Sequence, residues 1–144
     1  MEEIKVIFEK LTETATIPCK KGEHEAGFDL FADEAVILKP GDWVTVSTGI
    51  AWEPSTPYCY MQIKGRSGMA FMYGVESTNA GVIDSTYRGE IKVRVFNTSD
   101  KEYTILRGDR VAQGVILPLP KITVVEGKVG SSERGTNGFG SSGR

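Results

Sequence analysis

The sequence predicts one all-β domain of antiparallel strands with a single short helix. Apolar residues alternate with polar ones over short segments, and these segments are rich in β-branched and aromatic residues. Gly, Pro, Asp or Asn bounds each segment. Short strands at this spacing favour a closed or double-layered fold, which leaves a sandwich, a barrel and a jelly roll open. The length of 144 residues suits one domain.

The predicted strands run from the amino terminus almost to the end of the chain. Apolar residues alternate from Ile4 to Phe8 in the first strand, and a loop follows from about Thr12 to Glu25. FDLFA then leads to a second strand near 35–38. The other predicted strands are 43–52, 58–64, 81–84, 90–97, 102–106, 110–119 and 121–127. The only plausible short helix lies in 66–75, where a compact apolar run follows Ser67.

The composition excludes several classes of protein. With 40% hydrophobic and 25% charged residues, the chain resembles an ordinary globular protein, and a net charge of −2 gives no sign of a nucleic-acid or membrane-surface protein. His24 is the only histidine, which excludes three-histidine zinc sites and Ser-His-Asp or Cys-His hydrolase pairs. Any hydrolysis by this chain must therefore use a carboxylate base.

The amino terminus and the cysteines indicate a reducing compartment. MEEIKVIFEKL carries acidic residues where a signal peptide needs basic ones, and no apolar run approaches the roughly 20 residues that cross a bilayer. Cys19 and Cys59 form no CxxC pair, and two buried reduced thiols are favoured over a disulfide. We expect an intracellular protein, cytoplasmic or nuclear, that is not secreted.

The composition changes at Gly127, where a segment rich in glycine and serine begins. We therefore predict a β domain over 1–126 and a mobile carboxyl-terminal arm over 127–144. A plain flexible end is one interpretation. Arg134 and Phe139 favour a binding role, because a glycine-rich backbone can curl around an anion, an arginine adds forked donors and an aromatic ring can cover a flat ligand.

Two motifs have the residue types of a phosphate site. In GRSG, residues 65–68, Arg66 offers guanidinium donors, while Ser67 offers a hydroxyl at the start of the predicted helix. Ser67 could instead simply cap that helix. In RGDRVAQGV, a turn precedes a strand that contains Gln113.

Two carboxylates stand out in apolar surroundings. Asp29 follows a glycine in AGFDLFA and could hold Mg²⁺ directly or through its waters, although a turn carboxylate is the usual interpretation. Asp84 ends GVID in NAGVIDSTYRGEIKV, where a partly buried carboxylate could activate a water as a general base. Tyr87 could pack flat against a sugar, whereas Arg88 and Glu90 could be only an exposed pair.

Together and in this order, the five motifs resemble those of the trimeric dUTP pyrophosphatase (dUTPase) family. The matching segments are AGFDLFA, GRSG, NAGVIDSTYRGE, GDRVAQGV and RGTNGFGSSG, which span Ala26 to Gly143. The resemblance implies a jelly-roll-like subunit and a homotrimer with shared active sites. It implies Mg²⁺-dependent hydrolysis of dUTP to dUMP and pyrophosphate, which limits uracil incorporation into DNA and supplies dUMP for dTMP synthesis.

The resemblance also implies roles for individual residues on the nucleoside side. Asp84 matches the general base that activates the attacking water, and Tyr87 matches the aromatic that stacks on deoxyribose and excludes a 2′-hydroxyl. Backbone groups of the hairpin resemble those that recognise uracil, and Lys92 matches a further residue of the pocket. The hairpin positions are Asn79, Gly81, Val82 and Ile83.

The remaining matches concern the phosphates. Arg66, Ser67, Gly68 and Gln113 match phosphate contacts, and Asp29 matches a carboxylate that holds a metal-bound water, the Mg²⁺ being bound mainly by the substrate phosphates. In the arm, Phe139 matches a lid over uracil. Arg134, Gly140, Ser141 and Ser142 match contacts around the γ-phosphate.

The chain departs from the family pattern at three positions. Gly65 stands where proline is usual, and Gly114 replaces a usual large aliphatic residue beside Gln113. Asn79 occupies a position often held by glycine, so the uracil contact could belong to Thr78 or to Asn79. None of these departures removes Asp84 or Tyr87.

Three other functions compete with that of a dUTPase. A dCTP deaminase on the same scaffold would lack Tyr-Arg-Gly after Asp84 and the arm that carries Phe139, and both are present. A non-catalytic dUTP-binding regulator would not need an intact Asp84, Tyr87 and Arg134. A purely structural β-sandwich explains the composition but not five ordered motifs.

Overall fold

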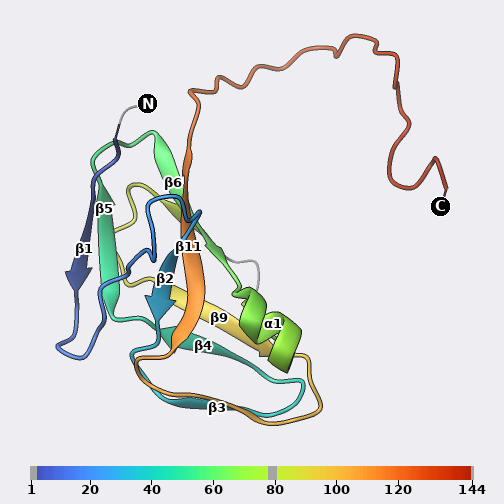
Figure 1. The fold of residues 1–144 in the computed structure, drawn as a ribbon. Helices are drawn as coiled ribbons and strands as arrows, with labels where there is room; N and C mark the ends of the chain where they lie inside the picture. Colours follow the sequence, from blue (N-terminus) through green and yellow to red (C-terminus); the bar gives the residue numbers. More distant parts are fainter. Residues whose placement is uncertain (1–2, 78–80, 144) are drawn as a thin grey trace.

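In the computed structural model, residues 3–77 and 81–143 are described, and strands dominate them (Figure 1). The elements in chain order are β1 (Val6–Lys10), β2 (Phe28–Phe31), β3 (Val36–Leu38), β4 (Trp43–Ser47), β5 (Ile50–Pro54), β6 (Cys59–Lys64), α1 (Ser67–Tyr73), β7 (Val75–Ser77), β8 (Val82–Asp84), β9 (Lys92–Asn97), β10 (Tyr103–Ile105) and β11 (Arg110–Pro118). The predicted all-β chain with one short helix is confirmed.

The strands form four small sheets. The largest has the order β2-β11-β6-β8, a second has the order β4-β9-β7, and β1-β5 and β10-β3 form two further pairs. Every pairing between the described strands is antiparallel. Strands far apart in sequence are neighbours, as β2 and β11 are in Figure 1, so the chain crosses between layers as the predicted jelly-roll-like fold requires.

A single hydrophobic core lies between the sheets, and the alternation of side chains explains it. In β9, Val93 and Val95 are fully buried while Lys92 and Arg94 are exposed. Successive side chains of a strand point to opposite faces, so one face supplies the core and the other meets solvent. The largest fully buried side chains include Trp52, Leu30, Leu38, Ile50 and Met61.

The predicted strand over 43–52 is two strands. β4 and β5 belong to different sheets and are separated at Gly49, which has a φ of +69°. A Cβ atom at this position would lie 2.6 Å from Oδ2 of Asp33, so both the backbone conformation and the space favour glycine. The alternation of apolar residues predicts β4 and β5 correctly, but it does not predict the turn at Gly49 between them.

Three other differences concern the extent of strands. FDLF is itself strand β2 rather than a lead into the next strand, and β7 was not predicted. The predicted strand over 121–127 is wrong, because the chain forms no helix or strand between 119 and 143. Val124 and Val125 are 90% and 81% exposed, and this segment has no neighbouring strand of the same chain to supply ladder hydrogen bonds.

The helix and the cysteines complete the comparison with the sequence. α1 begins after Arg66 and ends at Gly74, whose φ of 66° is the left-handed conformation common at helix ends. Both cysteines are free, as predicted; Cys59 is buried, but Cys19 is exposed, which corrects the prediction of two buried thiols. Within the described part of the chain, no helix has the length and apolarity to cross a membrane.

Candidate active site

Asp84 is the last residue of β8, opposite Tyr60 of β6. Its side chain is exposed and lines two cavities, one on each side of the strand end. The smaller cavity has a volume of about 260 Å³ and is lined by Val82, Ile83, Asp84, Tyr87, Glu90 and Lys92. The larger has a volume of about 630 Å³ and is lined by Cys59, Tyr60, Gln62, Val82, Asp84, Ser85, Thr86 and Leu119. The structure therefore gathers the predicted nucleoside-side residues around one carboxylate.

Cys59 lines the larger cavity together with Asp84, and a cysteine there raises the question of a thiolate nucleophile. Burial raises the pKa of the Cys59 thiol, and its Sγ lies 3.5 Å from the carbonyl oxygen of Thr56. A buried protonated thiol is a poor nucleophile. The chemistry of this cavity is therefore left to the Asp84 carboxylate, as the count of histidines already required.

Tyr87 presents one face of its ring to the smaller cavity. Its hydroxyl donates a hydrogen bond of 2.8 Å to the carbonyl oxygen of Glu90, and the ring lies over Gly89, where a Cβ atom would be 2.6 Å from Cζ of Tyr87. The side chain remains 44% exposed. A ring held in this way, with one face free, suits stacking against a flat or weakly polar group such as a sugar.

The residue directly before β8 is Gly81, and the space around it admits only a glycine. The amide of Ile63 donates a hydrogen bond of 2.7 Å to the carbonyl oxygen of Gly81, and a Cβ atom at Gly81 would lie 2.8 Å from the Ile63 carbonyl oxygen. Glycine is found in strands where another backbone segment approaches this closely. Asn79 and Thr78 lie outside the described residues.

A separate cavity contains the predicted phosphate residues. Its volume is about 290 Å³, and it is lined by Lys21, Glu25, Ala26, Gly27, Asp29, Arg66, Ser67, Gly68 and Gln113. Arg66 is the residue before α1 and makes no side-chain cap, and Ser67 is already the first helical residue. The alternative in which Ser67 only caps the helix is therefore wrong.

Asp29 lies between two arginines in this cavity. Its carboxylate oxygens are 3.8 Å from Nε of Arg66 and 3.8 Å from Nη1 of Arg110, and its side chain is 17% exposed. Arg110 was not predicted, because its partner is on another strand. Each guanidinium group lies near a different oxygen of the carboxylate, and that of Arg66 lines the cavity, where a planar guanidinium suits recognition of phosphate.

The residues around Asp29 fit a magnesium ion only in part. In the described ranges, no group of three or more His, Cys, Asp or Glu side chains lies close enough to hold a metal ion. Mg²⁺ commonly keeps several waters and takes one or two carboxylates together with substrate phosphates. Asp29 could thus contribute a contact through water to an ion whose other ligands come from a bound nucleotide.

Gln113 is held at the edge of the phosphate cavity. Its Nε2 donates a hydrogen bond of 2.9 Å to the carbonyl oxygen of Gly65, and a Cβ atom at Gly27 would lie 2.8 Å from Oε1 of Gln113. At Gly114, the ring of Phe28 occupies the space that a side chain would need. A Cβ atom there would lie 2.6 Å from Cε2 of Phe28. The unusual glycine beside Gln113 is therefore matched by a large aromatic residue on β2.

The arm does not meet either cavity in the single chain. Figure 1 shows the chain after β11 running away from the β domain. Within the arm, Nε of Arg134 donates to the carbonyl oxygen of Asn137 at 2.7 Å, and the amide of Gly138 donates to Oγ of Ser141 at 2.8 Å. Phe139 is fully exposed with a φ of +49°. The arm residues Arg134, Phe139, Gly140, Ser141 and Ser142 are thus not brought together with Asp84.

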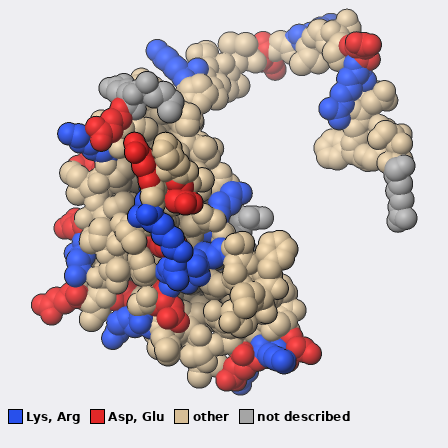
Figure 2. All heavy atoms as spheres, viewed as in Figure 1, with Lys and Arg blue, Asp and Glu red and all other residues tan. Residues whose placement is uncertain are grey.

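The surface of the β domain differs from region to region. Figure 2 shows Lys and Arg side chains on the near face of the β domain with Asp and Glu side chains among them, whereas the area over α1 is mostly free of charge. Phe71 and Met72 of α1 are 91% and 72% exposed. Charged side chains of both signs therefore cover much of this face, while α1 presents apolar side chains to solvent.

The fold and the cavities define a class: an all-β protein with an exposed carboxylate between two cavities and a separate cavity lined by arginine, serine and glutamine. Residues 13–143 match the family model described as dUTPase. The chain belongs to the dUTPase family.

Relatives of known name cover nearly the whole chain. It is 42% identical to the deoxyuridine 5′-triphosphate nucleotidohydrolase of Nautilia profundicola, over 98% of this chain and 100% of the relative. It is 46% identical to the enzyme of the same name from Hydrogenobaculum sp., over 97% of this chain and 99% of the relative. Among solved structures, the dUTPase of Staphylococcus bacteriophage 80alpha with dUpNHpp is similar with a TM-score of 0.85, 27% identity and coverage of 97% and 99%.

Proposed function

We propose that this protein hydrolyses dUTP to dUMP and pyrophosphate, with Asp84 as the general base for a water that attacks the α-phosphate. The observation that carries the proposal is the exposed carboxylate of Asp84 at the end of β8, beside the half-exposed ring of Tyr87. A general base must lie within hydrogen-bond reach of the water from which it takes a proton. The position between two cavities leaves room for that water and for a phosphate.

The relatives support the substrate. Two enzymes that are 42% and 46% identical to this chain are named deoxyuridine 5′-triphosphate nucleotidohydrolases. A phage dUTPase with the same fold was solved with dUpNHpp, an imido analogue of dUTP. Such an enzyme would limit uracil incorporation into DNA and supply dUMP for dTMP synthesis.

The smaller cavity would take the nucleoside. Backbone groups of Gly81, Val82 and Ile83, with Asn79, would read the polar edge of uracil, and a narrow hairpin would exclude the methyl group of thymine. Tyr87 would stack on deoxyribose and leave no room for a 2′-hydroxyl. Lys92 lines the same cavity.

The other cavity would take the phosphates. Arg66, Ser67, Gly68 and Gln113 line it, and the guanidinium of Arg66 is oriented by Asp29. Charge-assisted bonds to phosphate are short and strong, and forked arginine donors add geometric specificity. Magnesium bound to the triphosphate would neutralise charge there, with Asp29 contacting the ion through water.

Asp84 and the phosphate residues line different cavities of the chain, since no residue lining the phosphate cavity lines either cavity beside Asp84. We propose a homotrimer in which neighbouring chains complete each site. Ile122, Val124 and Val125 are 70–90% exposed in the single chain, an apolar segment that a neighbouring subunit would cover.

The arm over 127–144 would close each site. Phe139 would cover uracil and Arg134, with Gly140, Ser141 and Ser142, would contact the γ-phosphate. An ordered arm expels water and strengthens the charges around the phosphates. The exposed glycines and serines of the free arm allow this change of conformation.

The proposal is tested by pyrophosphate release from dUTP, dCTP, dTTP and UTP, each with Mg²⁺, for the wild type and for Asp84→Asn. We expect turnover of dUTP alone, reduced in Asp84→Asn by about 10²- to 10⁴-fold because the base is lost. Binding of dUpNHpp by the variant serves as the control for an intact site. Comparable turnover of dCTP, or full activity of Asp84→Asn, would contradict the proposal.

A further inference from the structure

The side chain of Arg88 makes several polar contacts, although the proposed function gives this residue no role. Its Nη1 donates to the carbonyl oxygen of Ser85 at 2.6 Å and reaches those of Trp52 and Tyr87 at 3.4 Å each. Its Nη2 lies 3.5 Å from Oε2 of Glu53. The exposed pair with Glu90 considered from the sequence is wrong, because Glu90 instead accepts a hydrogen bond from the amide of Gly49 at 2.9 Å.

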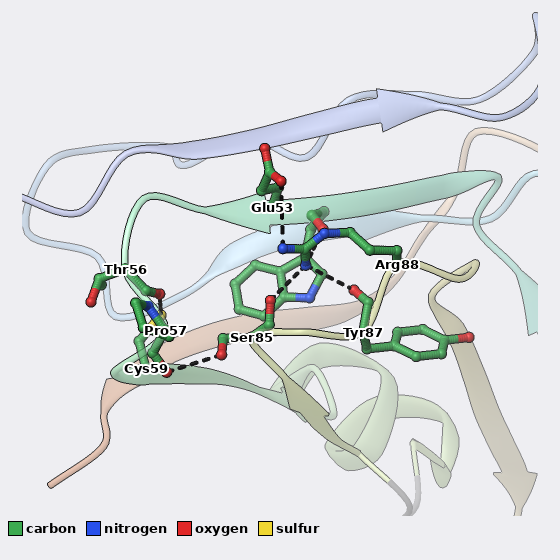
Figure 3. Close-up of polar contacts among 8 residues, drawn as sticks. Glu53, Thr56, Pro57, Cys59, Ser85, Tyr87 and Arg88 are labelled. Carbon is green, nitrogen blue, oxygen red and sulfur yellow. Dashed lines mark hydrogen bonds and ion pairs between the residues drawn. The ribbon is translucent and has the colours of Figure 1, made fainter. Parts of the chain in front are cut away.

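These contacts join the turn after β8 to strand β5. Figure 3 shows the Arg88 guanidinium between Glu53 of β5 and the turn that carries Ser85 and Tyr87. The same turn is tied to the loop before β6, because Oγ of Ser85 donates to the carbonyl oxygen of Pro57 at 2.9 Å. Within the turn, the amide of Tyr87 donates to the carbonyl oxygen of Asp84 at 3.1 Å.

We propose that Arg88 is a positioning residue, which sets the separation and orientation of Asp84 and Tyr87 by clamping the turn between them to β5. The inference rests on the proposed function of those two side chains. β8 is only three residues long, so pairing with β6 cannot fix the turn alone. The guanidinium uses Nη1 for the carbonyl oxygens and Nη2 for Glu53, and the single ammonium of a lysine cannot reproduce this fixed pair of donors.

The location of Arg88 separates this role from substrate binding. Arg88 is not among the residues that line either cavity beside Asp84. The ligand-facing groups of the turn are the carboxylate of Asp84 and the ring of Tyr87, and both are free of polar contacts to Arg88's side chain. Arg88 instead contacts the backbone that carries them, so its loss would move base and ring together.

The expected effect follows from that displacement. In Arg88→Ala, kcat for dUTP falls about 10- to 100-fold, because small misplacements of reacting groups cost rates of this size. The preference for dUTP over UTP in kcat/KM also falls about tenfold, because the ring that excludes the 2′-hydroxyl is no longer fixed. Arg88→Lys keeps the charge but not the fork, and should recover only part of both losses.

Arg107→Ala is a matched control. Arg107 also pairs with a carboxylate, at 3.8 Å from Oδ1 of Asp33, and its Nε donates to a carbonyl oxygen, that of Asp33, at 3.2 Å. The two arginine side chains are similarly exposed, at 58% and 50%, but Asp33 is 6% exposed and Glu53 is 55% exposed, so Arg107→Ala disturbs stability at least as much and is a stringent control. Arg107 lines neither cavity beside Asp84, and Arg107→Ala should keep the dUTP/UTP ratio of the wild type.

Amide hydrogen exchange gives a readout independent of activity. Exchange at Tyr87 should accelerate in Arg88→Ala and stay at the wild-type rate in Arg107→Ala, because the Tyr87 amide bonds within the clamped turn. If Arg88→Ala does not fold, Arg88→Lys decides the question. Unchanged exchange and an unchanged dUTP/UTP ratio in the folded Arg88 variant overturn the inference. A wild type that does not turn over dUTP refutes the proposed function, while the exchange comparison still tests the clamp.

Discussion

Asp33 is one of the few buried polar residues, and its environment makes the stability of the fold depend on pH. Oγ1 of Thr12 donates a hydrogen bond of 2.5 Å to Oδ2 of Asp33, and Nε of Arg107 lies 3.8 Å from Oδ1. The hydrogen bond from Thr12 lowers the pKa of the Asp33 carboxyl, and Thr14, Arg107 and Lys10 lower it further by smaller amounts. Burial raises the pKa, but the lowering effects together are larger. The ionised form therefore stabilises the folded state.

The sign of the pH dependence follows from that lowered pKa. The stabilising contribution is fully present above the pKa of the unfolded chain, about 3.9, and is lost as the pH falls through the lower pKa of the folded state. Asp33→Asn should lower the free energy of unfolding by about 1–3 kcal/mol at pH 7, and this difference should shrink below about pH 4. Urea unfolding of both proteins between pH 7 and 3 measures it. A difference that stays constant with pH would contradict the assignment.

The strands place the two glycines that depart from the family pattern in very different surroundings. A Cβ atom at Gly114 in β11 would lie 2.6 Å from Cε2 and 2.9 Å from Cζ of Phe28. At Gly65, after the end of β6, the nearest atom to a Cβ atom would be the amide nitrogen of Ser77, at an ordinary 3.5 Å. The first glycine is required by packing between β2 and β11, and the second is not.

Alanine at each glycine tests this difference between the elements. Gly114→Ala should lower the free energy of unfolding by about 1–3 kcal/mol, because Phe28 must shift out of its position. Gly65→Ala should be neutral or raise it by about 0.4–1 kcal/mol, because the unfolded chain loses freedom and nothing clashes. Thermal unfolding of the two variants provides the measurement, each acting as control for the other. Equal losses of stability in both would show that the space around Phe28 does not matter.

At the scale of the whole molecule, the separation of the two cavities has a direct consequence. If the base and the phosphate arginine of each site come from different chains, inactive variants can complement each other. Asp84→Asn and Arg66→Ala should each be nearly inactive, whereas trimers reassembled from a mixture should recover part of the wild-type rate. Pyrophosphate release after denaturing and refolding the mixture measures this recovery. A rate no higher than the sum of the separate variants would place the whole site in one chain.

The arm gives a second prediction at this scale. Deleting 127–144 should leave assembly intact, because the core and the described strands end before it. Hydrolysis should slow by about tenfold or more, because the site would stay open to water without Phe139 and Arg134. Light scattering checks the oligomeric state and pyrophosphate release the rate. Full activity of the truncated protein would remove the lid role of the arm.

The sequence by itself determined most of the β-strands, the helix and the family. Alternation of apolar and polar residues is a local property, so β6, β9 and β11 were predicted close to their observed bounds. Motifs are local too, and Asp84, Tyr87, Arg66 and Gln113 are predicted as site residues because their neighbours in sequence match the family motifs. The single histidine excluded whole classes of hydrolase by a count alone.

Only the tertiary structure decided which distant segments meet. The pairing of Arg88 with Glu53, of Asp29 with Arg110 and of Phe28 with Gly114 joins residues on different strands, and no local pattern specifies such partners. The predicted strand over 121–127 failed for the same reason: its composition favours a strand, but a strand forms only where another chain segment supplies hydrogen bonds. Periodicity reports which face of a segment is apolar, whereas the partners of that face depend on packing of the whole chain.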